Sequence, residues 1–129
     1  MNTIEIQQLT KKDGKIEALR GVDLQVPQGI IFGLLGANGA GKSTLIKALV
    51  GALKPTSGDM RVLGLNPLND KTKLRAQIGY MPQDVALYAD LSARENLRFF
   101  GKAHGVQNLE QRISEAMEFT ELTKRANDP

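Results

Sequence analysis

One stretch decides the fold of this chain: Gly36-Ala37-Asn38-Gly39-Ala40-Gly41-Lys42-Ser43-Thr44. It fits the pattern of Gly, any four residues, Gly, Lys and then Ser or Thr, which defines a phosphate-binding loop. The apolar residues 30–35 before it predict a buried strand, and residues 45–50 after it predict a helix. Strand, glycine-rich loop and helix is the order that this chemistry requires, so a chance match in a glycine-rich turn is disfavoured. The sequence predicts a site for a nucleoside triphosphate.

The residue types in the loop suit a dense anion. Several backbone N–H groups must reach the phosphate oxygens, and Gly36, Gly39 and Gly41 leave room for that approach and allow unusual backbone angles. The first turn of the following helix adds N–H donors and the positive end of its dipole. Lys42 supplies a mobile positive charge for the β- and γ-phosphates, and the Ser43 hydroxyl suits Mg²⁺, which prefers oxygen ligands. The other members of the candidate site are Ala37, Asn38, Ala40 and Thr44.

Length and composition are those of an ordinary globular domain. The chain has 129 residues, 41% of them hydrophobic and 24% charged, with a net charge of +3. Its 17 Lys and Arg residues are scattered, which argues against a dedicated nucleic-acid surface. Without cysteine, neither a disulfide nor a thiolate metal site can form. No apolar run approaches the roughly 20 residues that span a bilayer. We therefore expect that any association with a membrane occurs through a partner protein.

Local patterns predict the remaining elements of an α/β fold. Apolar and polar residues alternate in two early segments, which predicts antiparallel strands beside the strand that leads into the loop. Ser92 and Glu95 form the pattern of a capping box, so a helix should begin there and end before Gly105. We expect strands over residues 3–7, 18–26, 59–63 and 78–81, and helices over residues 70–77, 92–104 and from Asn108 onward.

Taken together, the sequence motifs of this chain resemble those in the amino-terminal half of an ABC transporter ATP-binding subunit, and the resemblance covers nearly all 129 residues. Residues 35–44 have that family's form of the Walker A loop, and Leu-Lys-Pro-Thr-Ser-Gly follows at residues 53–58. Residues 78–83, Ile-Gly-Tyr-Met-Pro-Gln, look like the approach to the family's Q-loop, and Leu-Ser-Ala-Arg-Glu-Asn-Leu follows at residues 91–97. The sequences of residues 80–83 and 95–100 most resemble those of ATP-binding subunits of bacterial exporters for drugs or polysaccharides.

This resemblance implies a fold and a set of roles. The fold would be a P-loop NTPase core of the ABC type with an amino-terminal antiparallel β subdomain. ATP and Mg²⁺ would bind at residues 36–44, with Ser43 as a metal ligand and Lys42 facing the transferred phosphate. Gln83 would place its amide oxygen near the metal and the attacking water. Residues 84–104 would face a transmembrane permease subunit, and a second ATP-binding subunit would close over the nucleotides. Such a protein lies in the cytoplasm, on the inner face of the membrane.

Two features depart from the family pattern. The early turn at Asp13 and Gly14 lacks the aromatic ring that usually stacks on adenine, so we expect weak affinity or selectivity for the base. The 129 residues also contain no Leu-Ser-Gly-Gly-Gln signature and no apolar run ending in Asp-Glu, the Walker B motif with its catalytic glutamate. We therefore expect a truncated domain over residues 1–129 that does not turn over ATP by itself.

Two alternatives stay open at this point. The chain could be a non-hydrolysing nucleotide-binding module, or it could belong to a soluble ABC-type ATPase that is not tied to transport. A small GTPase is disfavoured, because the sequence contains no Asn-Lys-x-Asp run for guanine recognition.

Overall fold

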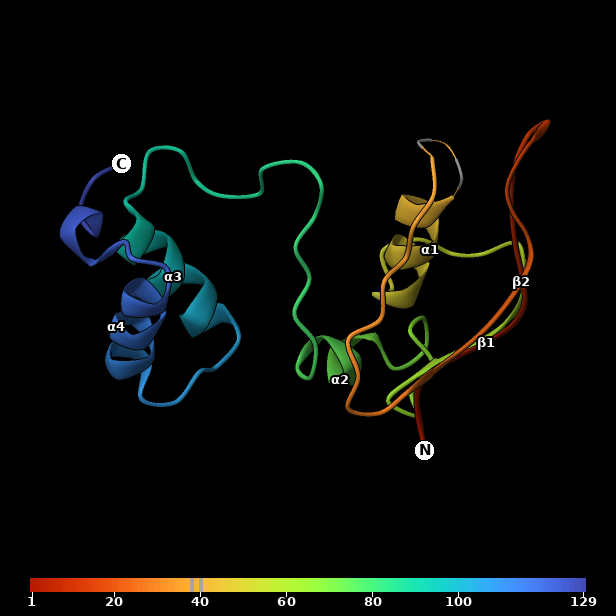
Figure 1. Ribbon diagram of the computed structural model, residues 1–129, viewed down its shortest axis with the longest axis horizontal. Coiled ribbons are helices and arrows are strands. Elements are labelled where there is room, and N and C mark those ends of the chain that lie inside the picture. The colour runs from red at the N-terminus through yellow and green to blue at the C-terminus, as the bar shows by residue number, and fades with distance from the viewer. Residues whose placement is uncertain (38, 40) are drawn as a thin grey trace. The chain divides into compact units, whose positions relative to one another are not determined.

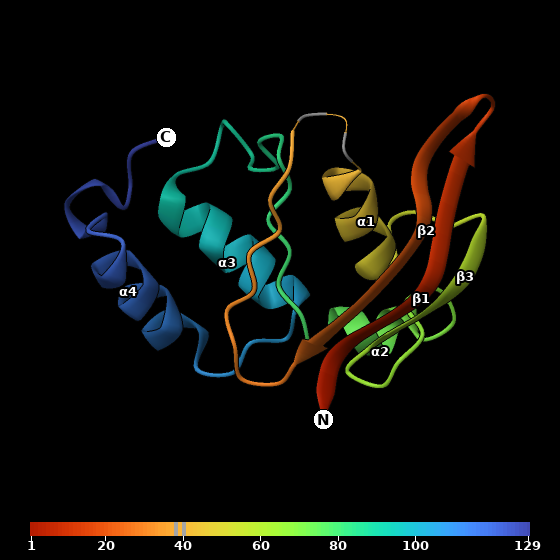
Figure 2. The ribbon, with the colours of Figure 1, turned by 45° about the vertical axis from the view of Figure 1, so that its right-hand side comes forward.

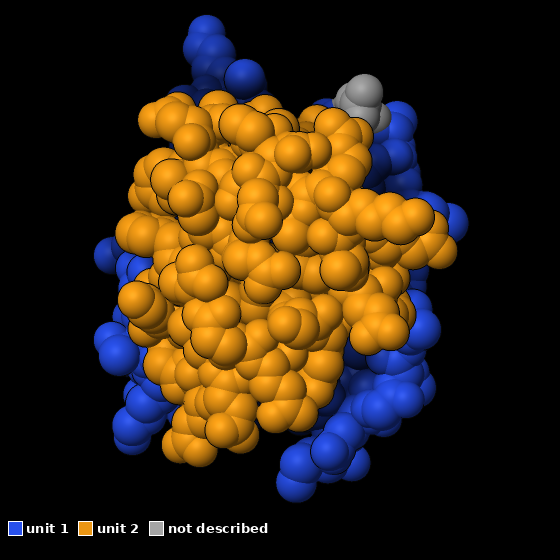
Figure 3. All heavy atoms as spheres, turned by 90° about the vertical axis from the view of Figure 1, so that its left-hand side faces the viewer, with its two compact units in different colours: residues 1–81 blue, residues 82–129 orange. Residues whose placement is uncertain are grey.

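The computed structural model of the chain describes residues 1–37, 39 and 41–129. These residues form two compact units, residues 1–81 and residues 82–129, which Figure 1 shows as a ribbon and Figure 3 distinguishes by colour. Each unit has its own hydrophobic core, so each is described by itself.

The first unit is built on a three-stranded antiparallel sheet. Its strands are β1 (Asn2–Asp13), β2 (Ile16–Pro27) and β3 (Ser57–Val62), in the order β2-β1-β3. The β1–β2 hairpin turns at residues 14–15, where Gly14 has a φ of 62°. The predicted early strands are therefore confirmed, and both are longer than the alternation of apolar residues suggested.

One helix covers this sheet. Helix α1 (Lys42–Leu49) buries Leu45 and Ala48 among apolar side chains of all three strands. Figure 2 shows α1 beside the twisted sheet, with the short helix α2 (Lys71–Arg75) below it. The core of the unit consists of Ile6, Leu9, Leu19, Leu45, Ala48 and Met60.

Two predicted strands are absent from the described part of the chain. Residues 30–35 and 78–81 both belong to the described ranges and form no strand, although both segments are mainly apolar. A strand forms only when a neighbour accepts and donates its backbone hydrogen bonds, and the sheet consists of β1, β2 and β3 alone. The predictions of a buried strand over residues 30–35 and of a strand over residues 78–81 were wrong for this reason, and the side chains of Ile31, Leu35 and Met81 are exposed instead.

The second unit is a helical hairpin. Helix α3 (Ala93–Ala103) and helix α4 (Leu109–Phe119) are followed by the 3₁₀ turn η1 (Thr123–Arg125). Ile113, Met117 and Ala126 form its core. No helix in the described ranges is both long and apolar enough to cross a membrane.

The predicted capping box at the start of α3 is confirmed. The Glu95 N–H donates to Ser92 Oγ at 3.2 Å, and the Ser92 N–H donates to Glu95 Oε2 at 2.8 Å. Further along, Arg98 and Glu110 join α3 to α4 through two hydrogen bonds of 2.7 and 3.0 Å. These bonds, and then the opposite charges, raise the pKa of the Arg98 guanidinium. The hydrogen bond from Arg98 lowers the pKa of the Glu110 carboxyl.

Asn96 fixes the chain that leads into α3. Its buried side-chain oxygen accepts the N–H of Tyr88 at 2.9 Å, and its amide group donates to the carbonyls of Tyr88, Leu91 and Ser92 at 3.0, 3.2 and 3.1 Å. A side chain within hydrogen-bond distance of four backbone groups, whose two amide hydrogens are shared among three carbonyls, defines the path of the loop.

We expect Asn96→Ala to destabilise the second unit by about 1–3 kcal/mol, because it leaves buried backbone groups without partners. Hydrogen exchange of the α3 and α4 amides measures this change. The exposed Asn69 provides the control, and Asn69→Ala should change stability by less than about 0.5 kcal/mol. Equal exchange in the two variants would contradict the role of Asn96.

Candidate phosphate-binding site

The predicted phosphate loop leads directly into α1 in the first unit (Figure 2). Two of its residues, Asn38 and Ala40, lie outside the described residues. Gly39 and Gly41 have φ angles of 85° and 92°, in the left-handed region that side chains disfavour. Both glycines therefore meet a backbone requirement, as the sequence pattern predicted.

Gly41 also meets a requirement of space. A Cβ atom at this position would lie 2.4 Å from the carbonyl oxygen of Ala18 and 3.1 Å from Leu19 Cδ2, both on β2. The end of the loop is therefore seated directly on β2. This contact fixes the point at which α1 begins.

The beginning of α1 suits an anion. Gly41 is the N-cap residue and has no side chain to accept the N–H groups of the first turn. The first turn contains no acidic residue, whereas Lys47 stands in the last turn. The positive end of the helix dipole therefore faces the loop without a carboxylate to neutralise it.

The side chain of Lys42 folds back over the loop. Its Nζ donates hydrogen bonds to the carbonyl oxygens of Gly36 and, at 3.3 Å, Ala37. None of the ion pairs formed by the described residues involves Lys42. The ammonium group is thus held at the loop by neutral carbonyls, which a phosphate oxygen can replace with a stronger charged hydrogen bond.

The other predicted site residues are divided between the two units. Ser43 is exposed and Thr44 is half-buried on the first turn of α1, next to Lys42. Gln83 is exposed and belongs to the second unit, so its proximity to the loop stays a prediction. No group of three or more His, Cys, Asp or Glu side chains that could hold a metal occurs among the residues described. A Mg²⁺ ion held by the Ser43 hydroxyl, phosphate oxygens and water fits this donor set.

A hollow beside the loop was not predicted from the sequence. It has a volume of about 440 Å³ and lies along β2, and its lining residues are Glu17, Ala18, Leu19, Arg20, Val22 and Gly39. The Glu17 carboxylate is paired with Lys12 at 3.1 Å and with Arg20 at 3.8 Å. None of the described residues that line this hollow is aromatic. The sequence feature that could have indicated this hollow is the small side chain of Ala18, which lies where the loop meets β2.

Comparison with known proteins agrees with this geometry. The sequence profile described as "ABC transporter" matches residues 19–129. The chain belongs to the ABC transporter family. The P-loop core of the ABC type with an amino-terminal antiparallel subdomain is thereby confirmed as its fold class.

Relatives within the ABC transporter family include two bacterial proteins. The chain is 43% identical to "Probable multidrug ABC transporter ATP-binding protein YbhF" of Escherichia coli, over 97% of this chain and 22% of that protein. It is 39% identical to "Linearmycin resistance ATP-binding protein LnrL" of Bacillus subtilis, over 97% of this chain and 41% of that protein. The chain thus spans less than half the length of these relatives.

Solved structures of the family superpose well on the chain. A structure described as the ATP-binding subunit of an ABC transporter matches with a TM-score of 0.85 at 29% identity, over 97% of this chain and 53% of that one. The cassette MJ0796, solved as a dimer bound to ADP and Pi, matches with a TM-score of 0.81 at 26% identity, over 96% of this chain and 60% of that one.

The close approach of Gly41 to the Ala18 carbonyl on β2 can be tested by adding one methyl group at Gly41. We expect Gly41→Ala to destabilise the first unit by about 2–4 kcal/mol, because it combines a left-handed φ with a clash against Ala18. Gly14→Ala is the matched control. Gly14 has a φ of 62° but open space around it, so that change should cost only about 1 kcal/mol. Hydrogen exchange of the β1 and β2 amides measures both, and an equal effect would show that the close approach does not matter.

Proposed function

We propose that this chain binds Mg²⁺ and ATP at residues 36–44 and is the nucleotide-binding part of an ABC transporter. The observation that carries the proposal is the glycine-capped beginning of α1, with the Lys42 ammonium held over the loop. Membership of the ABC transporter family supports it.

Each residue of the loop has a separate task in this proposal. Gly36, Gly39 and Gly41 let the backbone approach the phosphates, and the first-turn N–H groups of α1 donate to their oxygens. Lys42 exchanges its carbonyl partners for the β- and γ-phosphates. The Ser43 hydroxyl is a ligand for Mg²⁺, which supplies charge neutralisation during phosphoryl transfer when it is bound.

Hydrolysis is proposed for the complete domain. A base or water-positioning residue is needed beside the phosphate, and Gln83 is the residue proposed here to orient the water. The sequence of 129 residues contains neither a Walker B run nor a signature motif. We therefore assign ATP binding to this chain and assign turnover, which drives export, to a domain that includes those motifs.

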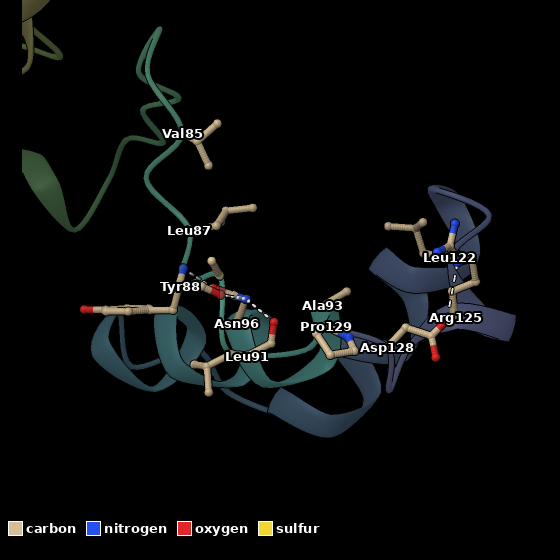
Figure 4. A pocket seen from close by; sticks show the side chains of 11 residues that line it. Val85, Leu87, Tyr88, Leu91, Ala93, Asn96, Leu122, Arg125, Asp128 and Pro129 are labelled. Atoms are coloured by element: carbon tan, nitrogen blue, oxygen red, sulfur yellow. Dashed lines mark hydrogen bonds and ion pairs between the residues drawn. The ribbon is translucent and has the colours of Figure 1, made fainter.

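The proposed partners are a transmembrane permease subunit and a second ATP-binding subunit, at the cytoplasmic face of the membrane. The second unit offers an apolar surface for the permease. Tyr88, Phe99 and Phe100 form a ring cluster with centroids 4.9–6.1 Å apart, and all three are partly exposed. A hollow of about 340 Å³ lies nearby, and Figure 4 shows Val85 and Leu87 on one side of it and Leu122 on the other.

The names of the relatives support an export role. YbhF is called a probable multidrug transporter protein, LnrL a linearmycin resistance protein, and a further relative from Cupriavidus pinatubonensis, 37% identical, a Nod factor export protein. Export of a small organic molecule is therefore the transport reaction that we propose.

Two lysines on the same helix test the binding site. We expect Lys42→Ala to weaken binding of Mg²⁺-ATP by about tenfold to a hundredfold, because a charged hydrogen bond to phosphate is lost. Lys47→Ala removes the same charge from the far end of α1 and should change the affinity by less than about twofold. Isothermal titration calorimetry measures both constants.

The calorimetry also shows which result would refute the site. Equal affinity in the wild-type chain and both variants would mean that ATP binds elsewhere, and absence of heat in all three would mean that this chain does not bind ATP. A thermal melt provides a second readout, since ATP at 100 times its Kd should stabilise the wild-type chain by about 2.7 kcal/mol.

A further inference from the structure

The net positive charge of the chain is concentrated in residues 54–77. This stretch contains five Lys and Arg residues and two Asp residues, so its net charge is +3, equal to that of the whole chain. The remainder of the chain is therefore neutral overall. Four of the five cations, Lys54, Lys71, Lys73 and Arg75, form what we call the basic patch. Such an asymmetry of charge points to an anionic partner.

Helix α2 presents three cations of the basic patch to solvent. Leu74 is fully buried and anchors the helix, whereas the other four residues of α2 are exposed. Lys71 and Arg75 are four residues apart and are therefore neighbours on the helix surface. Lys73 projects from another side of the same exposed surface.

The chain that follows α1 runs beside α2 and adds Lys54 to the patch. A Cβ atom at Gly51 would lie 2.5 Å from the carbonyl oxygen of Pro67 and 3.4 Å from Lys71 Cε. Figure 2 shows the same arrangement, with α2 at the end of α1. Lys54 follows this contact by three residues and is exposed.

The basic patch has no carboxylate partner within the described part of the chain. Six other Lys and Arg side chains form the ion pairs of these residues, and no member of the patch takes part in one. The carboxylate of Asp70, directly before α2, accepts the N–H of Asn66 at 3.0 Å. Like charges four residues apart on a helix destabilise it, so Lys71 and Arg75 would be stabilised by an external anion.

The composition of the patch favours a lipid surface as that anion. The centres of protein interfaces are depleted in Lys and use aromatic anchors, and proteins that bind single-stranded nucleic acid stack its bases on aromatic rings. Residues 54–77 contain no Phe, Tyr or Trp. Clusters of about four or more Lys and Arg residues without such rings are typical of surfaces that bind anionic lipid headgroups.

We propose that the basic patch binds the anionic headgroups of a phospholipid membrane. The attraction is spread over many headgroups and needs no pocket, and each Lys or Arg near the surface strengthens binding about fivefold. Salt weakens it, because the charges are exposed. This binding goes beyond the proposed function and needs no nucleotide, so each proposal can fail without the other.

Vesicle binding tests the proposal with a defined probe. The chain is mixed, without nucleotide, with vesicles of phosphatidylcholine alone or with about 30% phosphatidylglycerol, and bound protein is measured by co-sedimentation. We expect at least about tenfold stronger binding to the anionic vesicles, and loss of most of it between about 0.1 M and about 0.5 M salt. Free glycerophosphoglycerol at the same phosphate concentration should not compete, because it lacks the array of charges.

Two charge-matched double variants locate the binding surface. Lys71→Glu with Lys73→Glu should weaken vesicle binding by at least about tenfold. Lys102→Glu with Lys124→Glu changes two exposed lysines of the second unit and should leave the affinity within about threefold. Each Lys→Glu change lowers the net charge by two, so both double variants go from +3 to −1. All four lysines are exposed, and a thermal melt should show that both variants stay folded.

Lys42→Ala separates this proposal from ATP binding. It leaves the basic patch intact and should bind the anionic vesicles within about twofold of the wild-type chain. A chain that binds vesicles but not ATP would refute the nucleotide site alone.

Three outcomes would overturn the proposal of a lipid surface. One is equal binding, or no binding, to neutral and anionic vesicles. Another is an equal loss in the two double variants, which would show that only the total charge matters. The third is tighter binding to duplex DNA than to the anionic vesicles at the same salt concentration, which would identify nucleic acid as the partner.

Discussion

The contact between Gly41 and the carbonyl oxygen of Ala18 is the constraint on which the first unit depends. Because only a hydrogen atom fits between them, β2 determines where α1 begins and in which direction its first N–H groups point. β2 is held in turn by β1, and β1 by β3, so the antiparallel sheet positions the phosphate loop. A change in this sheet would therefore reach the candidate site without touching a site residue.

The elements that could be predicted from the sequence are those with local signals. The capping box at Ser92 and Glu95, the alternation along β1 and β2, and the helix after the loop depend on residues within a few positions of one another. Residues 30–35 and 78–81 were predicted as strands from composition alone. Strand formation depends on a partner that composition does not contain, so this prediction was wrong in the described chain.

In the candidate site, too, features with a local sequence signal differ from features that depend on distant parts of the chain. The glycines, Lys42 and Ser43 were predicted as site residues from their spacing, because phosphate binding needs these residue types in consecutive order. The sequence did not predict that the Lys42 side chain folds back onto the Gly36 carbonyl, nor that a hollow lies along β2. Both features depend on how distant segments pack. The role of Gln83 came only from the resemblance to the ABC transporter family. It stays a prediction, because Gln83 lies in the other unit.

The most direct test of the phosphate site is an amide ¹⁵N NMR titration of the chain with Mg²⁺-ATP. Our account predicts that the largest shift changes fall on residues 36–45, the loop and the first turn of α1, and that they saturate with a single Kd. Mg²⁺-triphosphate without the nucleoside should shift the same amides, since the account places most of the recognition on the phosphates. Changes centred on the second unit, or no change at saturating ATP, would contradict the account.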